Sequence, residues 1–168
     1  SKRHGAVNIL SYKNEGYLPK ALLNYIVRLG WSHGDQELFS INEMIELFDL
    51  KDINKSPASF NKDKLIWLNQ NYIKSTKIDE LVNHLKYHLG NKSINTNTGP
   101  KIENVVESLR DRSKTLIEMT ENCAMFYHDF DSFDSDLAKK FFQAESRPIL
   151  ENLLSNLEDL DLWTADEI

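Results

Sequence analysis

Apolar residues recur along this chain mostly at the three- and four-residue steps of an α-helix. One predicted helix carries the apolar stripe Leu22, Tyr25, Ile26 and Leu29. Pro19 can begin this helix, because the first helical position needs no backbone N–H. The same spacing predicts helices over residues 41–48, 61–74, 76–90, 102–120, 136–142 and 147–160. Alternating strand patterns are almost absent, so we expect a mainly α fold with at most a short β element.

Helix ends are signalled by glycine and by capping pairs. Gly30 follows the last periodic residue of its helix and predicts a left-handed C-terminal position. Ser40 with Glu43 reads as a capping box, and Thr76 with Asp79 resembles a second capping pair. These signals predict helices that begin near residues 41 and 77.

Two stretches lack a decisive period. Residues 7–12 fit either a strand or a first helical turn. Residues 49–60 mix turn-forming residues with a proline, so we expect a loop with one bridge of extended pairing.

The candidate core follows the predicted stripes. In the helix over 61–74 the predicted apolar side is Leu65, Trp67, Leu68, Tyr72 and Ile73. Toward the end of the chain, we expect four aromatic residues to lie in the core of a bundle, namely Phe130, Phe133, Phe141 and Phe142.

Charge is distributed unevenly along the 168 residues, although the net charge is −6. Residues 1–34 hold five basic residues against one acidic residue. Residues 35–114 balance at twelve against twelve, and residues 115–168 hold thirteen acidic residues against three basic ones. Phosphate binding requires clustered Lys and Arg, so a nucleic-acid surface fits the first third and the basic run before residue 115.

Cysteine content and hydropathy limit the class of protein. The single Cys123 excludes an internal disulfide and a cysteine-cluster zinc site, and it fits a reducing compartment. No apolar run approaches the ~20 residues that span a bilayer. We therefore expect a cytoplasmic chain without membrane partners.

The corner at residues 31–36 places several reactive side chain types in one turn. His33 and Asp35 invite a metal or acid–base interpretation, but no further ligand lies nearby in sequence. A capped helix–loop–helix corner explains the same residues, and we predict no metal site. Trp31 fits a core position better than a base-stacking one.

Two segments carry a resemblance to a known family. Residues 22–40, LLNYIVRLGWSHGDQELFS, resemble the segment that follows the KMSKS loop in bacterial-type glutamyl-tRNA synthetases. Residues 1–6, SKRHGA, resemble the second half of that loop. The two matches occur in the family's order and near its spacing. The loop match at residue 1 and a helix-start signal at residues 164–167 predict a piece of a longer protein, from its C-terminal part.

The resemblance implies a domain organisation and an activity. Residues 1–75 would form a helical stem-contact domain with a remnant of the KMSKS loop, and residues 76–168 the first part of a helical anticodon-binding domain. The intact enzyme would attach glutamate to tRNA-Glu with ATP and Mg²⁺, through glutamyl-adenylate. No complete catalytic site is expected here, so the chain alone would be an inactive monomer. Whether the parent also charges tRNA-Gln stays open.

The resemblance also assigns candidate site residues. Ser1, Lys2 and Arg3 match the part of the loop that binds ATP. The tRNA-binding candidates are the basic side chains Lys13, Lys20, Arg28, Arg110, Arg112 and Lys114. A solvated charge on a helix surface explains each of these equally simply. Two other functions remain as alternatives, an autonomous helical RNA-binding module and a helical protein-interaction domain.

Overall fold

The computed structural model describes residues 8–55, 57–129, 132–162 and 164. Within these ranges the regular structure is helical, and the one extended pairing is an isolated antiparallel bridge between Trp31 and Ile53. The mainly α prediction is therefore confirmed, as is the bridge expected in the loop over 49–60. No described helix has the length and apolar character needed to cross a bilayer.

The first helices are α1 (Ile9–Asn14), α2 (Pro19–Gly30), α3 (Ile41–Leu47) and α4 (Lys62–Ser75), with a short 3-10 turn at Leu50–Asp52. The ambiguous stretch at 7–12 is thus helical from Ile9, with Asn8 as its N-cap. Pro19 occupies the first turn of α2, and Ser40 with Glu43 forms the predicted capping box of α3. Local chemistry therefore determines where these helices begin.

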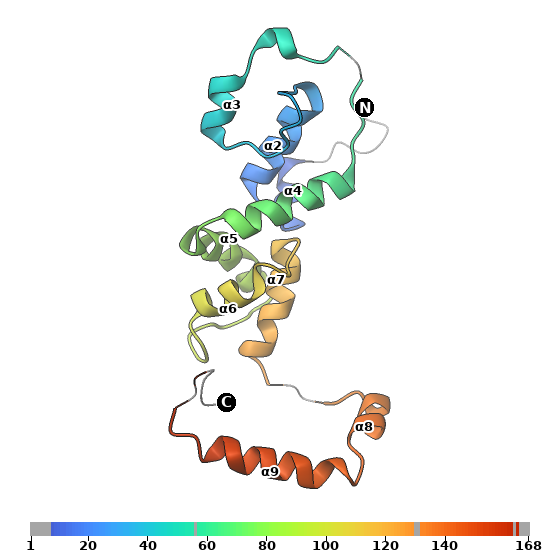
Figure 1. Cartoon of the computed structure of the whole chain (residues 1–168), viewed down its shortest axis with the longest axis vertical. Helices are drawn as coiled ribbons and strands as arrows, with labels where there is room; N and C mark the ends of the chain where they lie inside the picture. Colours follow the sequence, from blue (N-terminus) through green and yellow to red (C-terminus); the bar gives the residue numbers. More distant parts are fainter. Residues whose placement is uncertain (1–7, 56, 130–131, 163, 165–168) are drawn as a thin grey trace. The chain divides into compact units, whose positions relative to one another are not determined.

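In the first part of the chain, helices α2 and α4 pack against each other (Figure 1). Their shared core consists of the buried residues Tyr17, Leu22, Tyr25, Leu65 and Leu68. A second cluster, formed by Trp31, Phe39 and Met44, closes the corner between α2 and α3. Trp31 is 1 % exposed, as its predicted core position requires. Trp67, in contrast, was expected on the apolar side of α4 and is 43 % exposed.

Helices α5 (Ile78–Asn91), α6 (Ile102–Leu109) and α7 (Leu116–Cys123) pack together, and α7 runs into a 3-10 turn at Ala124–Phe126. Their core is a continuous apolar cluster that includes Leu81, Val82, Leu85, Leu89, Val105, Val106, Leu116, Met119 and Cys123. Leu18, Ala21 and Ile73 join the same cluster. The core thus continues from α2 and α4 into the α5–α7 helices without a gap.

Three local predictions are wrong. Gly30 is the last residue of α2 rather than a left-handed cap, and Trp31 after it is extended with a φ of −141°. Thr76 closes α4 instead of opening α5, because its hydroxyl donates to the Tyr72 carbonyl. The expected helix over 102–120 is two helices with a turn between them. Thr115 caps the second of these by accepting from the Glu118 N–H.

Asn69 joins three segments at the centre of this first part. Its side chain is completely buried, and its Oδ1 accepts from the Leu18 N–H at 2.8 Å. Its Nδ2 donates to the carbonyls of Gly16 at 3.4 Å and of Lys114 at 2.7 Å. The Leu116 N–H in turn donates to Gly16 at 2.9 Å. One side chain therefore ties α4 to the loop before α2 and to the turn before α7.

The chain divides into two compact units, with the boundary between His128 and Asp129. The second unit contains α8 (Ser135–Phe141) and α9 (Ser146–Glu158). The expected aromatic core is not found there, because Phe133, Phe141 and Phe142 are 55–61 % exposed. Phe130 lies outside the described residues. Two short helices cannot enclose a core by themselves, so their apolar sides stay exposed. The predicted domain division at residue 75 stays a prediction.

Candidate nucleic-acid interface

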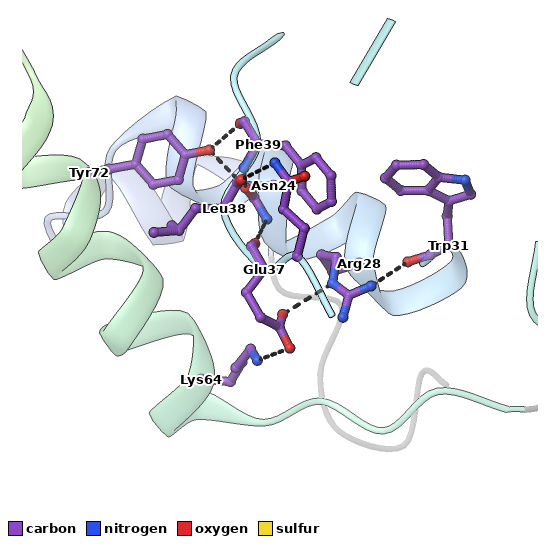
Figure 2. A network of polar contacts seen from close by, with 9 residues as sticks. Asn24, Arg28, Trp31, Glu37, Leu38, Phe39, Lys64 and Tyr72 are labelled. Atoms are coloured by element: carbon purple, nitrogen blue, oxygen red, sulfur yellow. Dashed lines mark hydrogen bonds and ion pairs between the residues drawn. The ribbon is translucent and has the colours of Figure 1, made fainter. Parts of the chain in front are cut away.

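The structure separates the six predicted tRNA-binding cations by what each side chain contacts. Arg28 lies inside a polar network at the α2–α3 corner (Figure 2). Its Nε is 3.1 Å from Glu37 Oε2, and its Nη1 donates to the Trp31 carbonyl at 3.3 Å. Lys64 on α4 pairs with the other oxygen of Glu37 at 2.8 Å. The hydrogen bond from Arg28, with the pairing of Lys64, lowers the pKa of Glu37 against the opposing effect of burial. Arg28 is therefore engaged in holding the corner.

Asn24 completes this network from the buried side of α2. It donates to the Glu37 carbonyl at 2.9 Å and accepts from the Phe39 N–H at 2.8 Å. The Tyr72 hydroxyl lies 2.8 Å from Asn24 Oδ1 and 2.6 Å from the Phe39 carbonyl. Burial raises the pKa of Tyr72 to about 12, so this hydroxyl stays a donor at neutral pH. Figure 2 shows these groups converging on the segment 37–39.

The corner side chains that suggested chemistry do not converge on a site. The His33 ring stacks on Trp31 at 6.0 Å between centroids, and Asp35 is exposed in the turn. Among the residues that the structure describes, no three His, Cys, Asp or Glu side chains come together as a metal site. The corner is organised by Asn24, which the sequence did not indicate, and by Tyr72, which was expected only as part of the apolar side of its helix. Buried amides give no periodic signal, and only their distant partners reveal them.

Arg110 closes the C-terminal end of α4. Its guanidinium donates to the carbonyls of Lys74 and Thr76, and it pairs with Glu107 at 3.0 Å. Its side chain is only 17 % exposed. The last carbonyls of a helix lack intrahelical partners, so a cation here satisfies them. Arg110 is accordingly a structural cap in this fold.

Lys20 reaches the same corner from the first turn of α2. Its Nζ is 2.8 Å from Glu80 Oε1 on α5, and both side chains are partly exposed. The hydrogen bond from Lys20 lowers the pKa of Glu80, and the nearby charges of His84 and Lys77 act in the same direction. The structure therefore brings Lys20 and Arg110, which are ninety residues apart in sequence, to the α4–α5 corner. Lys77 belongs to this corner and was not among the predicted residues.

Lys13 faces a different surface. Its ammonium lies 4.0 Å from the ring centroid of Tyr87 on α5, whose hydroxyl donates to Asn14 at 2.8 Å. A mostly apolar cavity of about 350 Å³ borders Lys13, His84 and the buried His88. Burial, together with the charge of Lys13, lowers the pKa of His88. A neutral imidazole at this cavity does not add to a phosphate-binding surface.

Arg112 and Lys114 lie on the turn between α6 and α7. Their side chains are exposed and make no hydrogen bond or ion pair within the described part of the chain. The backbone of Lys114 is held on both sides, since its carbonyl accepts from Asn69 and its N–H donates to Glu118 at 2.7 Å. The expectation that this basic run lies on a helix face is wrong, but the turn presents two free cations on a fixed backbone. Ser1, Lys2 and Arg3 lie outside the described residues.

Comparison with protein families matches most of the chain in two successive parts. Residues 1–67 match the catalytic domain of class I tRNA synthetases (E and Q). Residues 79–168 match the anticodon binding domain family. Asn69 lies between these two matches, and Lys114 lies within the second.

Individual relatives agree with the family matches. The chain is 51 % identical over its whole length to the glutamate–tRNA ligase of Ruthia magnifica subsp. Calyptogena magnifica, and it covers 37 % of that protein. It is 54 % identical to the glutamate–tRNA ligase of Vesicomyosocius okutanii subsp. Calyptogena okutanii, again over the whole chain and 36 % of the relative. The chain thus spans little more than a third of the length of these curated relatives.

Solved structures give the same result for the fold. A crystal structure of a glutamate tRNA ligase from Elizabethkingia meningosepticum superimposes with a TM-score of 0.77 at 29 % identity, covering 89 % of this chain and 30 % of that one. Glutamate-tRNA synthetase from Elizabethkingia anophelis gives a TM-score of 0.70 at 30 % identity, covering 89 % and 29 %. The chain is a homologue of the glutamate–tRNA ligases, and it belongs to the anticodon binding domain family.

Proposed function

We propose that this chain is the tRNA-binding portion of a glutamate–tRNA ligase. The observation that carries the proposal is the succession of two family matches in one chain, the synthetase catalytic-domain match followed by the anticodon-binding match. In the intact enzyme, glutamate would be attached to tRNA-Glu with ATP, through glutamyl-adenylate. Residues 1–75 would act as the stem-contact domain and residues 76–168 as the first part of the anticodon-binding domain.

The ATP-binding part of the proposal concerns residues outside the described ranges. Ser1, Lys2 and Arg3 would contact the triphosphate, with Mg²⁺ as its counterion, because a flexible lysine can follow charge that develops on phosphate. Because the chain spans little more than a third of its curated relatives, we expect it to be inactive in aminoacylation on its own. We further propose that it is a cytoplasmic monomer.

For tRNA contact, the side-chain environments rank the candidates. Arg112 and Lys114 have no side-chain partner among the described residues, whereas Arg28 and Arg110 are engaged with Glu37 and with the end of α4. We propose that Arg112 and Lys114 contact the tRNA directly. Arg28 and Arg110 would then support the fold rather than bind RNA. Lys13, which lies over Tyr87, would be a peripheral contact.

The experiment is a binding titration of this 168-residue chain with a labelled tRNA-Glu transcript, an unrelated tRNA and tRNA-Gln, each at several salt concentrations. We expect tighter binding to tRNA-Glu and an affinity that falls with salt, because neutralised phosphates release counterions. The tRNA-Gln arm tests whether the parent discriminates between the two tRNAs. Undetectable binding to every tRNA at low ionic strength would contradict the proposal.

A protein-interaction function for the second unit is the alternative that one observation favours. Helix α9 exposes the apolar side chains Ile149, Leu150, Leu153 and Leu154. An apolar row of this kind marks a surface that another segment covers. Light scattering tests this alternative: self-association of the native chain that Leu153→Lys abolishes, without tRNA binding, would favour it over the tRNA-binding proposal.

A further inference from the structure

A groove of about 520 Å³ lies at the corner where α4 ends and α5 begins. Its walls come from the first turn of α2, the start of α3, the last turn of α4 and the first turn of α5. The groove is therefore built by segments on both sides of residue 75. None of the residues that line it was predicted as a site except Lys20.

Two ammonium groups and one carboxylate meet in this groove. Lys20 is held 2.8 Å from Glu80, whereas the exposed Lys77 makes no hydrogen bond or ion pair through its side chain with any described residue. The pKa of Glu80 is lowered first by the hydrogen bond from Lys20, and the charges of His84 and Lys77 lower it further. Lys20, Lys77 and Glu80 all line this groove, so both positive charges lie near the same carboxylate.

The hydroxyl groups of Ser75 and Thr76 cannot supply further donors to the groove. The Ser75 hydroxyl donates to the Asn71 carbonyl at 3.0 Å, and the Thr76 hydroxyl donates to the Tyr72 carbonyl at 2.6 Å. Each hydroxyl has one hydrogen, so both are already used within α4. The charged donors of the groove are its lysine ammonium groups, which suit phosphate oxygens.

We propose that this groove binds a phosphate of an RNA backbone, with Lys77 and Lys20 as the contacting groups. The proposal rests on the tRNA-binding function proposed above and adds a sequence-independent contact to it. Glu80 competes with the phosphate for Lys20, so it limits the affinity of the groove. Arg110 adds positive charge behind the groove, where it donates to the Thr76 carbonyl.

The decisive variants act in opposite directions. Lys77→Ala removes the exposed ammonium group of the groove, and we expect weaker tRNA binding with a salt slope that is smaller by about 1. Glu80→Gln releases Lys20 and removes the competing carboxylate, so we expect severalfold tighter binding. A gain of affinity does not arise from structural damage. The matched control is Lys86→Ala on α5, whose exposed ammonium, among the described residues, donates to Asn83 alone at 3.1 Å. This change should leave the affinity within twofold of the native chain.

The measurement is fluorescence anisotropy with labelled tRNA in the native 168-residue chain and each variant, with thermal midpoints to verify folding. Equal losses of tRNA affinity for Lys77→Ala and Lys86→Ala, or no gain of affinity for Glu80→Gln, would contradict phosphate binding in the groove. The tRNA-binding function of the native chain would be unaffected by that result. No binding by the native chain would instead reject the tRNA-binding function itself, and the groove proposal with it.

A second readout distinguishes RNA from a free anion. Backbone amide chemical shifts of residues 75–80 are followed by NMR during titration with tRNA and with inorganic phosphate. We expect tRNA to shift these amides at far lower concentration than phosphate does. Shifts with phosphate but none with tRNA would identify a site for a free anion and overturn the assignment to an RNA backbone.

Discussion

The side-chain amide of Asn69 donates to the backbone carbonyl of Lys114 across 2.7 Å, between residues that are 45 positions apart in sequence. The same amide group accepts from Leu18 on its other side. This bond determines where the turn that carries Arg112 and Lys114 lies relative to α2 and α4. A buried asparagine thus connects the region after the catalytic-domain match to the anticodon-binding helices.

Replacement of Asn69 tests this connection. Asn69→Ala leaves the Leu18 N–H and the Lys114 carbonyl unpaired in the core, so we expect a loss of about 2–4 kcal/mol in the free energy of unfolding. The matched control is Asn71→Ala, because the Asn71 amide donates only to the Trp67 carbonyl of its own helix. Its expected change is within about 0.5 kcal/mol. Urea denaturation measures both variants. Equal losses of unfolding free energy would show that the hydrogen bonds of Asn69 to distant segments add nothing beyond those of an ordinary helix asparagine.

Gly16 tests the same junction from the backbone. Its φ is +83°, and an added Cβ would lie 2.6 Å from the Ile117 nitrogen and 2.9 Å from the Leu116 nitrogen. We expect Gly16→Ala to lower the free energy of unfolding by at least ~2 kcal/mol, because both the backbone conformation and the contact with α7 become strained. Gly90→Ala is the opposite case, since nothing lies within 4 Å of its Cβ position in α5. It should stabilise the chain by about 0.5 kcal/mol, and destabilisation by both changes would argue against this account.

Glu37 predicts a pH dependence of stability. Arg28 and Lys64 lower the pKa of Glu37 in the folded chain. The stability that the Glu37 carboxylate contributes is therefore fully present above its pKa in the unfolded chain, and it is lost as the pH falls through its lower pKa in the folded chain. We expect Glu37→Gln to destabilise the chain at neutral pH and to have little effect in acid, where the native carboxyl is protonated too. Glu46→Gln, at an exposed position of α3, is the control. Denaturation curves at both pH values check this, and a loss that persists unchanged in acid would contradict the charge assignment.

Tyr72 predicts a loss of stability at alkaline pH. Its pKa is raised to about 12, whereas an unfolded tyrosine ionises near ~10, so the unfolded chain loses this proton first as pH rises. Stability should therefore fall between about pH 10 and 12. Tyr72→Phe removes this component of the pH dependence and, by breaking the bonds to Asn24 and Phe39, costs about 1–2 kcal/mol at neutral pH. Ultraviolet titration with and without Tyr72 checks the assignment; an unchanged late phase would place it on another tyrosine.

Arg110 and Arg112 are two positions apart and should behave differently. Arg110→Ala leaves the last carbonyls of α4 without their partner, so we expect a loss of about 1–2 kcal/mol in stability. Arg112→Ala should change stability by less than about 0.5 kcal/mol and weaken tRNA binding, with a larger effect for tRNA-Glu than for an unrelated tRNA. Denaturation and anisotropy measure the two effects. Equal losses of affinity for both tRNAs would make Arg112 a phosphate contact.

Local sequence signals predicted most helices because their causes are local. The capping box of Ser40 with Glu43 and the helix predicted from the apolar period of α2 depend on nearby residues, and both are confirmed. Of the predicted stripe, Leu22 and Tyr25 are buried, whereas Ile26 is 50 % exposed. The predictions of helix ends failed where a residue distant in sequence binds the backbone. The helix expected over 102–120 is interrupted at a turn that Asn69 binds, and the end of α4 is closed by Arg110 from the far side of that turn.

The sequence by itself determined the helical class, the positions of most helix starts and, through the segments 1–6 and 22–40, the family. Only the tertiary structure decided which basic side chains are free. Arg28, Lys20 and Arg110 find partners 9, 60 and 34–36 residues away in the chain, whereas Arg112 and Lys114 find none among the described residues. Charge is a property of each residue, but its availability to a ligand depends on neighbours that folding brings together, and no local pattern records them.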